Sequence, residues 1–276
     1  MKNFVIIAIV GSVMSLVSCN KKGCTDATAI NYVLEATKDD GSCQYAQPDA
    51  TESGKVTLVL EHQWENETVP FSLESELTHS VTGDQLTFTL LKYYVSNIRL
   101  KDENGTWWSQ PESYHLVDFS QPATTQINVS NIPAGNYTEI SYIMGVDSIR
   151  NVSGAQSGAL STTHGMFWSW NTGYIHLKAE GTSPQSTNGN AFTYHLGGFA
   201  GANNIVTLKN GNFGGQKLIV SKTSNGKVKI GLDISELFTN TGSVASLANI
   251  HMAGPNAVSM GGGFFDNGVF FKSIEN

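Results

Sequence analysis

Short alternating segments, separated by turn-forming residues, restrict the fold of this chain more than any other feature. "KVTLVLEH" at 55–62 places apolar residues at every second position, and "QLTFTLLKYYVSNIRL" at 85–100 is rich in β-branched and aromatic residues. A period of two is typical of a strand with one buried face. Further strands are predicted in "SYHLVDF", "TQINVS", "NYTEISYIMGVD", "GYIHLKAEG", "AFTYHLGGF", "NIVTLKN", "QKLIVSK", "KVKIGLDI" and "GVFFKSI".

Clusters of Gly, Pro, Asn and Ser separate these segments, and we find neither an internal repeat nor a long amphipathic helix. The pattern predicts an all-β fold, an antiparallel β-sandwich with long loops. One exception is "DISELF" at 233–238, where we expect one or two helical turns with Asp233 as the N-cap.

The beginning of the chain has the pattern of an export signal. Lys2 is followed by an apolar run from Phe4 to Val17, which is too short for a comfortable transmembrane helix. The run ends in "LVSC", which resembles a bacterial lipobox. We therefore expect residues 1–18 to be a lipoprotein signal peptide and Cys19 to carry the lipid, although an ordinary secretory signal is the alternative. A lipoprotein would be anchored in a lipid bilayer of the cell envelope, facing the periplasm from the outer membrane or displayed on the cell surface.

Two more cysteines bound a small module, residues 19–47. If Cys19 is lipidated, Cys24 and Cys43 remain, and an oxidising compartment favours a disulfide between them. Closing a loop of about twenty residues stabilises a fold by roughly 3 kcal/mol. The segment resembles a Cys-bounded motif, "GCTD…DDGSC", of secreted and surface proteins of Bacteroidetes-type bacteria.

Three aspartates of this module, Asp26, Asp39 and Asp40, offer the oxygen ligands that calcium prefers. Their spacing is not that of a calcium loop. Solvated turn residues are the simpler interpretation, and calcium is the alternative.

Residues 48–54 are expected to be a polar linker into a main domain at 55–276. Charged residues make up 14% of the sequence, the net charge is −7 and basic residues are not clustered, so nucleic acid is not an expected partner. The motifs of serine hydrolases, zinc proteases, P-loops and dinucleotide-binding folds are absent. Asp147 and Glu180 are acidic, but nothing in the sequence places them together. We therefore predict a protein that is not an enzyme.

Three of the seven histidines lie in predicted strands beside apolar residues. His62 ends the apolar face of its strand, His115 shares the face of Val117, and His195 precedes a Gly-Gly turn. Imidazole binds copper, zinc, iron and nickel, although a single histidine in such a place is more often a hydrogen-bonded core residue. With no free thiol and no clustered methionines, a soft-metal site would be built mainly from imidazole.

Tryptophan is concentrated in "GMFWSWNTGYIHLKAEG" at 165–181. Its alternation predicts a strand with Trp168 and Trp170 on one face, filling the sandwich core, and a redox role is the alternative. His176 occupies a strand position where an apolar or aromatic residue is expected.

These segments together resemble a known family, the MbnP-like copper-binding domain, which is related to copper-binding proteins of methane-oxidising bacteria. The resemblance covers about residues 54–276. The strings that carry it are "LKYYVSNIRL", "ESYHLVD", "GVDSIRN", "GMFWSWNTGYIHLKAEG", "YHLGGF" and "GPNAV".

The resemblance implies a β-sandwich that binds copper, with copper(I) favoured, through a few histidines. Carried over, it implies His62 and His115 as the first ligand pair and His195 as a third ligand. It also implies that a tryptophan near the site can be oxidised to kynurenine by a di-haem peroxidase-like partner, and Trp64 is the candidate because it shares a strand face with His62. An outer-membrane transporter is a further possible partner.

The leading hypothesis is thus an exported copper-binding lipoprotein that serves copper acquisition or sequestration. The alternative is a surface adhesion or glycan-binding sandwich without metal, with Trp107 and Trp108 in "NGTWWSQ" as its platform. The same pair can equally be the apolar base of a hairpin.

Overall fold

The computed structural model describes residues 21–26, 29, 31, 33, 36–44, 53–65, 69–154, 156–168 and 173–276. The chain divides into two compact units, 1–46 and 47–276, and each is described by itself. The predicted signal peptide, Cys19 and most of the predicted linker lie outside the described residues. No helix within the described residues has the length and apolar character needed to cross a membrane.

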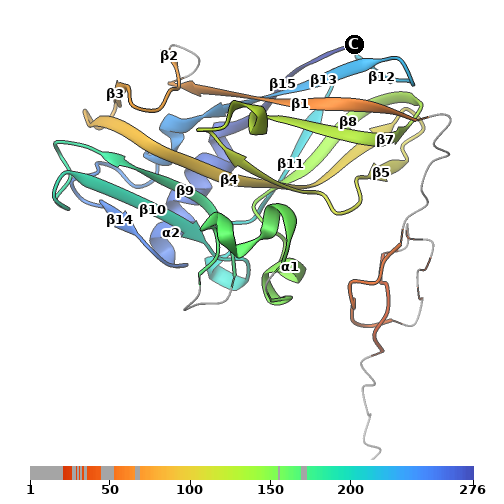
Figure 1. Ribbon diagram of the computed structural model, residues 1–276, viewed down its shortest axis with the longest axis horizontal. Coiled ribbons are helices and arrows are strands. Elements are labelled where there is room, and N and C mark those ends of the chain that lie inside the picture. The colour runs from red at the N-terminus through yellow and green to blue at the C-terminus, as the bar shows by residue number, and fades with distance from the viewer. Residues whose placement is uncertain are drawn as a thin grey trace, which may run out of the picture. The chain divides into compact units, whose positions relative to one another are not determined.

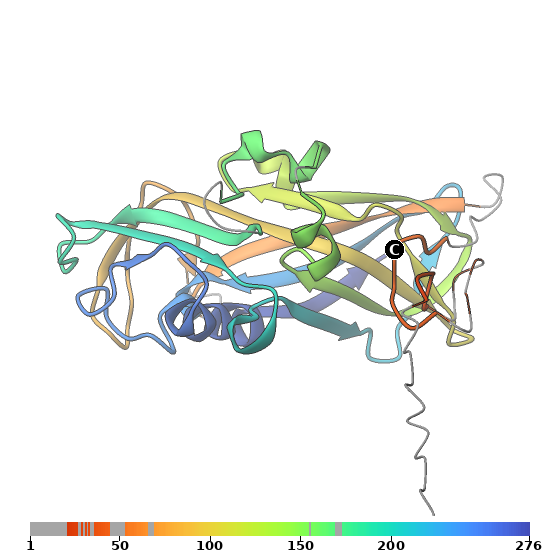
Figure 2. The same cartoon turned by 90° about the horizontal axis from the view of Figure 1, so that it is seen from below.

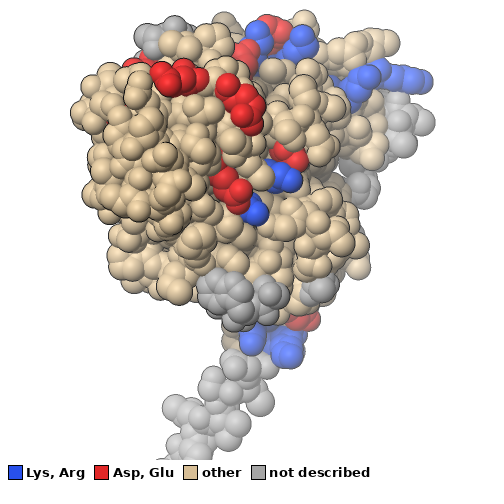
Figure 3. Space-filling model, turned by 60° about the vertical axis from the view of Figure 1, so that its left-hand side comes forward, with Lys and Arg blue, Asp and Glu red and all other residues tan. Residues whose placement is uncertain are grey.

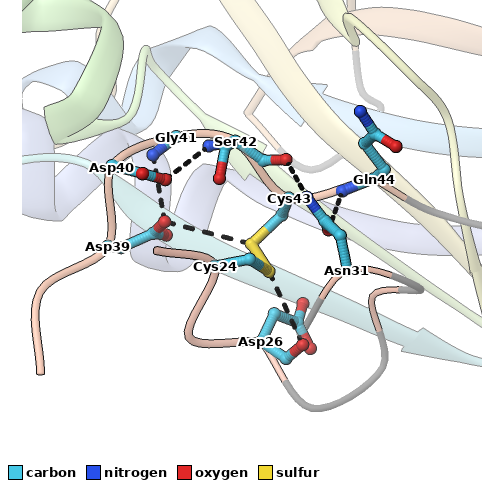
Figure 4. The surroundings of a disulfide bond; sticks show 9 residues. All are labelled: Cys24, Asp26, Asn31, Asp39, Asp40, Gly41, Ser42, Cys43 and Gln44. Carbon is cyan, nitrogen blue, oxygen red and sulfur yellow. Dashed lines mark hydrogen bonds between the residues drawn. A yellow bond between two sulfur atoms is a disulfide. The ribbon is translucent and has the colours of Figure 1, made fainter. Parts of the chain in front are cut away.

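The first unit is built around a disulfide bond between Cys24 and Cys43, as predicted (Figure 4). The side chain of Asn31, within the loop, holds the Cys43 end, because it donates to the Ser42 carbonyl and accepts from the backbone of Gln44.

The aspartates of this unit bond to their own turn. Oδ1 of Asp39 accepts from the Gly41 backbone at 3.0 Å, and Oδ1 of Asp40 accepts from the Ser42 backbone at 3.0 Å. Such turns stabilise a local bend without a metal, which favours the interpretation as turn residues over a calcium site.

The second unit contains two β-sheets, as the alternating segments predict. Within the described residues the smaller sheet has five strands: β1 (Ser53–Trp64), β2 (Val69–Pro70), β7 (Gln126–Pro133), β13 (Asn225–Asp233) and β15 (Val269–Glu275). β1 lies at the centre of this sheet, with β13 on one edge and β7 followed by β2 on the other. Figure 1 shows β1, β13 and β15 running side by side.

The larger sheet is organised along the long strand β4 (Gln85–Asp102). β9 and β8 pair with one edge of β4, and β3, β6 and β5 pair with the other. Its other strands are β3 (Glu76–Thr78), β5 (Trp107–Ser109), β6 (Tyr114–Asp118), β8 (Gly135–Met144), β9 (Ile175–Thr182), β10 (Ala191–Gly197), β11 (Thr207–Asn212), β12 (Leu218–Val220) and β14 (Asn249–Ile250).

Two pairings depart from the predicted antiparallel arrangement. β1 pairs with β13 in parallel, Lys55 opposite Asn225, and β10 pairs with β14 in parallel, Thr193 opposite Asn249. Parallel neighbours require crossover connections. Periodicity could not reveal them, because a strand alternates in the same way in either direction.

Short helical segments lie against the two sheets (Figures 1 and 2). The predicted turn at "DISELF" is confirmed, with the Asp233 carboxylate accepting from the Ser235 backbone at 3.1 Å as the N-cap. The helical segments are η2 (Pro122–Thr125), α1 (Ser148–Val152), η3 (Gly158–Leu160), η4 (Thr162–His164), η5 (Gly201–Asn203), η6 (Ile234–Leu237), α2 (Pro255–Gly262) and η7 (Gly263–Gly268).

The sandwich core lies between the two sheets. The apolar residues of β1, Val56, Leu58 and Leu60, are buried in it, and they meet the buried face of β4 that carries Tyr93 and Val95. We call the side of the larger sheet that faces this core its inner face, and the opposite side its outer face. A second, smaller cluster lies on the outer face beneath α1, η3 and η4, and its members are Tyr94, Val146, Leu160, Met166, Trp168, Tyr174 and Ile175.

The prediction for the tryptophan-rich segment was partly wrong. β9 begins only at Ile175, and Trp168 packs in the smaller cluster rather than in the sandwich core. Its ring lies so close to Gly197 that a Cβ there would be 2.4 Å away, at a point where the pairing of β10 and β9 shifts register. Trp170 lies outside the described residues.

Charged side chains are few, and several of them form ion pairs. On the face shown in Figure 3, uncharged residues dominate, and some of the basic side chains lie next to acidic ones. Ion pairs on the strands include Lys229–Glu275, Lys272–Glu61 at 2.8 Å, Lys92–Asp118 at 2.9 Å and Lys101–Glu139 at 3.1 Å. These pairs leave no run of unneutralised cations among them.

Candidate metal centre

His62 projects from β1 into the space between the sheets. It has the same parity as the buried residues Leu58 and Leu60. Its Nε2 atom lies 2.8 Å from the hydroxyl oxygen of Tyr93 on β4, and its ring centre lies 4.6 Å from that of Phe119. The imidazole is therefore held between the two sheets by one polar and one aromatic neighbour.

Burial keeps the His62 imidazole neutral. It lowers the pKa of His62 to about 4, and a hydrogen bond to the Leu60 backbone opposes this only in part. Burial also raises the pKa of Tyr93 far above its usual range, so the phenol stays protonated. The phenol therefore donates to Nε2, while the other ring nitrogen carries the proton, and the lone pair of His62 lies on Nε2.

His115 lies on β6, an edge strand of the larger sheet. It pairs with Val95, whose side chain is in the sandwich core, so His115 also faces inward. Its Nε2 atom lies 3.0 Å from Oε1 of Gln110. An amide oxygen only accepts, so Nε2 donates and the lone pair lies on Nδ1. Burial lowers the pKa of His115 to about 4, so this imidazole is neutral too.

The two histidines meet the same short stretch of β4. Tyr93, the partner of His62, pairs with Val117, and Val95 pairs with His115. Tyr93 and Val95 are consecutive residues on one face of a strand, about 6.6 Å apart. The structure thus directs both neutral imidazoles into the space between the sheets, His62 from β1 against Tyr93 and His115 from β6 beside Val95.

His195 lies elsewhere. Its neighbours Tyr194 and Leu196 on β10 are in the sandwich core, so His195 projects from the outer face of the larger sheet. There its Nε2 atom lies 2.7 Å from Oε1 of Glu180. Because the sheet separates it from His62, the structure does not bring this third predicted ligand to the other two.

Trp64 faces inward, as its parity with His62 predicts. It is fully buried, and its indole nitrogen donates to the Thr78 carbonyl at 3.1 Å. Its ring packs against those of His79, Phe88 and Phe238, at 6.0 to 6.4 Å between centres. Its ring contacts thus differ from those of His62, which packs against Tyr93 and Phe119.

Sequence patterns did not reveal the partners of the predicted ligands. Tyr93 is one of two adjacent tyrosines in a strand of mixed apolar and polar residues, and Gln110 lies in a polar turn. Only the pairing of β4 with β6 and its packing on β1 place them beside the histidines. A buried tyrosine in a strand is a usable signal, because its hydroxyl needs a partner.

His176 is fully buried, but on the outer side of the sheet. The Val146 backbone donates to its Nδ1 at 3.2 Å, so the proton is on Nε2. A protonated nitrogen has no lone pair to offer. Burial lowers the pKa of His176 to about 4. We therefore assign His176 to packing rather than to ligand binding.

The motif "GVDSIRN" has a structural role. Asp147 caps α1 and accepts from Asn97 at 3.0 Å and from the Tyr114 hydroxyl at 2.6 Å. Asn151 accepts from the Tyr174 backbone at 2.8 Å, which ties this motif to the tryptophan-rich segment. The motif "GVDSIRN" and the tryptophan-rich segment thus hold each other in place on the outer face of the larger sheet.

Trp107 and Trp108, the pair considered as a glycan platform, are adjacent residues of β5 and face opposite sides of the sheet. Trp108 packs against the sandwich core, while Trp107 lies under the side chains of Arg99 and Lys101, at 5.1 and 5.7 Å. The two rings therefore do not form one flat surface.

Over the described part of the chain, no group of three or more His, Cys, Asp or Glu side chains is arranged to hold a metal ion. The candidate centre is accordingly a two-histidine arrangement. Neutral imidazoles without a carboxylate suit a soft, singly charged ion better than a hard divalent one.

Comparison with known proteins gives a consistent result. The family model described as MbnP matches residues 53–253. No curated protein matches the chain. Among solved structures, MbnP from Methylosinus trichosporium is similar, with a TM-score of 0.47 and 16% sequence identity over 75% of this chain and 87% of that chain.

Proposed function

The chain belongs to the MbnP family, and on that premise we propose that it is a copper-binding protein of the cell envelope that holds copper(I) through His62 and His115. Membership of the MbnP family suggests a copper-related function. The proposed role is copper acquisition or sequestration, without catalysis. The observation that carries it is the pair of partly buried, neutral imidazoles that face each other's sheet across the same stretch of β4, at Tyr93 and Val95.

The donor set fits copper. Imidazole nitrogen is a good ligand for copper, and a neutral imidazole does not have to lose a proton before it binds. The available lone pairs are Nε2 of His62 and Nδ1 of His115. Bound there, copper would be held in a mainly apolar space where Phe119 limits the approach of water.

A hydrogen bond at the other ring nitrogen orients each of the two imidazoles. Gln110 fixes the tautomer of His115, and the Leu60 backbone does the same for His62. Tyr93 has a different role, because its hydroxyl uses the same lone pair that copper would take. Copper binding at His62 therefore replaces one hydrogen bond.

Export and lipidation form part of the proposal. The Cys24–Cys43 disulfide supports it, because such bonds persist in oxidising compartments. The "LVSC" sequence supports attachment of lipid to Cys19. Metabolic labelling with a fatty acid, compared between the natural chain and Cys19→Ala, tests the anchor directly.

Elemental analysis of the mature protein, lacking residues 1–19 and loaded with copper(I), tests the metal. We expect about one copper per chain in the natural sequence and loss of copper in His62→Ala and His115→Ala. His164→Ala is the matched control, because His164 is exposed and bonds only to the nearby Gly158 carbonyl. Full copper content in the double variant His62→Ala/His115→Ala would refute the proposal.

Trp64 remains the candidate for oxidation by a di-haem peroxidase-like partner. Peptide mass mapping of protein purified from its natural host tests this, and a shift confined to the Trp64 peptide would support it. An unmodified Trp64 would mean that the two histidines are the only protein ligands that the proposal assigns to copper.

A further inference from the structure

Two histidines lie side by side on the outer face of the larger sheet. β14 pairs with β10 in parallel, with Tyr194 opposite Ile250, so the next residues, His195 and His251, follow at the same level. Their ring centres are 5.2 Å apart, with an angle of 86° between the planes. His251 is exposed and His195 is partly exposed, so solvent reaches the pair.

This spacing fits two imidazoles that share one metal ion. A metal lies about 2.0–2.1 Å from an imidazole nitrogen and about 3.2 Å from the ring centre, so two rings at a tetrahedral angle have centres about 5.2 Å apart. The observed separation of His195 and His251 equals that distance. The ring centres are therefore already spaced for one ion, and rotation of the side chains has only to direct one nitrogen of each ring toward it.

Glu180 prepares one of the two imidazoles. Its Oε1 atom lies 2.7 Å from Nε2 of His195, so Nε2 donates and Nδ1 keeps a lone pair. A carboxylate on the far nitrogen is the usual partner of a metal-binding histidine, because it fixes the tautomer and raises ligand basicity.

Glu180 and Lys178 carry opposite charges beside His195. Lys178 lies 3.4 Å from the same Glu180 oxygen. Burial lowers the pKa of His195, while the bond to Glu180 opposes the shift and the charge of Lys178 adds to it.

We propose that His195 and His251 are the protein ligands of a second metal site, which binds a divalent transition-metal ion such as Zn²⁺ or Cu²⁺, and that Glu180 is its positioning residue. Water completes the coordination. The site is independent of the copper(I) centre proposed above, because the larger sheet separates the outer face from the inner one.

The pair differs from the inner site in the chemistry that it favours. It combines an adjacent carboxylate, free access to water and two imidazoles, which suit zinc and copper(II). The inner site lacks the carboxylate and much of the water. One protein would thus hold ions of different charge on the two faces of one sheet.

Calorimetric titration of the mature protein with Zn²⁺ tests the proposal. The titration uses the His62→Ala/His115→Ala variant, so that zinc binding at the inner site does not contribute to the measured heat. We expect one zinc per chain, and loss of binding in His195→Ala and in His251→Ala alike. Because both ligands serve one ion, the combined variant loses no more than either single one. His164→Ala is the matched surface control and keeps full binding.

Glu180→Gln tests the positioning role. We expect zinc affinity to fall by about 10- to 100-fold, with Glu180→Asp restoring part of it. A long-range ¹⁵N–¹H spectrum should show Nδ1 of His195 as the nitrogen that shifts on adding zinc. Circular dichroism confirms that each variant is folded.

Zinc binding that survives His195→Ala or His251→Ala would overturn the proposal, and so would absence of binding in the folded parent. Losses that simply add in the combined variant would also overturn it, because separate surface imidazoles behave in that way. None of these results affects the inner copper centre, which the elemental analysis tests.

Discussion

The Nε2 atom of His62 on β1 lies 2.8 Å from the hydroxyl oxygen of Tyr93 on β4, so one hydrogen bond joins the smaller sheet to the larger one. The phenol donates to the lone pair that a metal would use. Its hydroxyl therefore stabilises the metal-free protein and competes with copper for the same nitrogen atom.

Replacing Tyr93 by Phe separates these two effects. We expect the metal-free variant to lose about 1–2 kcal/mol of unfolding free energy, because a buried imidazole nitrogen loses its partner. Copper(I) affinity should rise several-fold, because no hydrogen bond has to be broken. Urea unfolding measures the first effect, and competition with a chromogenic copper(I) chelator measures the second. Weaker copper binding in this variant would show that the metal does not use Nε2 of His62.

Gln110 should control the affinity through His115. Its amide oxygen fixes the His115 tautomer at 3.0 Å, and loss of such an outer contact typically weakens a metal site by about 10- to 100-fold. We expect this loss in Gln110→Ala and near-normal affinity in Gln110→Glu, which keeps an acceptor. Equal affinities in all three proteins, by the same competition assay, would exclude Gln110 from the site.

Acid should destabilise the protein through His176. Its pKa is about 4 when folded and about 6.5 when unfolded. Between these values the unfolded chain binds a proton that the folded chain excludes, so stability falls as pH decreases from 6.5 to 4, by on the order of 3 kcal/mol.

Urea unfolding as a function of pH measures this. The slope across that window should be smaller in His176→Gln, while His164→Gln, at an exposed position, should keep the natural slope. An unchanged slope in His176→Gln would mean that this imidazole does not remain neutral in the fold.

The disulfide should stabilise only the small N-terminal unit. The chain forms two compact units, and Cys24 and Cys43 both lie in the first. A cross-link over 19 positions contributes roughly 3 kcal/mol. In Cys24→Ser/Cys43→Ser we expect rapid proteolysis of the first unit and an unchanged melting temperature of the second. A lower melting temperature would show that the two units stabilise each other.

The all-β class and most strands could be predicted because alternation records which face of a strand is buried. Val56, Leu58 and Leu60 marked the inner face of β1, and the same parity correctly turned His62 and Trp64 inward. The alternation of side chains is set within one strand, so it can be predicted without knowing which strands lie beside it.

Relations between strands were harder to predict. His195 has the appearance of His62 in the sequence, yet the two lie on opposite sides of the larger sheet. The alternation of a strand does not say which sheet it joins, and apolar neighbours on both sides of His195 gave no warning. His251 was missed because it follows a two-residue strand that has no periodicity of its own.

The Trp168 prediction failed for a different reason. The segment alternates in sequence, but Gly173 adopts a positive φ of 113° and the strand begins only after it. A side chain at that glycine would also meet Asn151 and Phe199. Tertiary packing thus overrides the local pattern there.

The parallel pairing of β1 with β13 sets the order in which the domain can mature. A chain that emerges from a ribosome or a translocation pore N-terminus first delivers β1 early, and Lys55 must then wait for Asn225 to arrive. Until then the central strand of the smaller sheet has one edge open, and open edges attract other strands. Contacts this distant in sequence form slowly. We therefore expect the pairing of β1 with β13 to form late in folding, with this edge of β1 exposed until residues 225–233 follow.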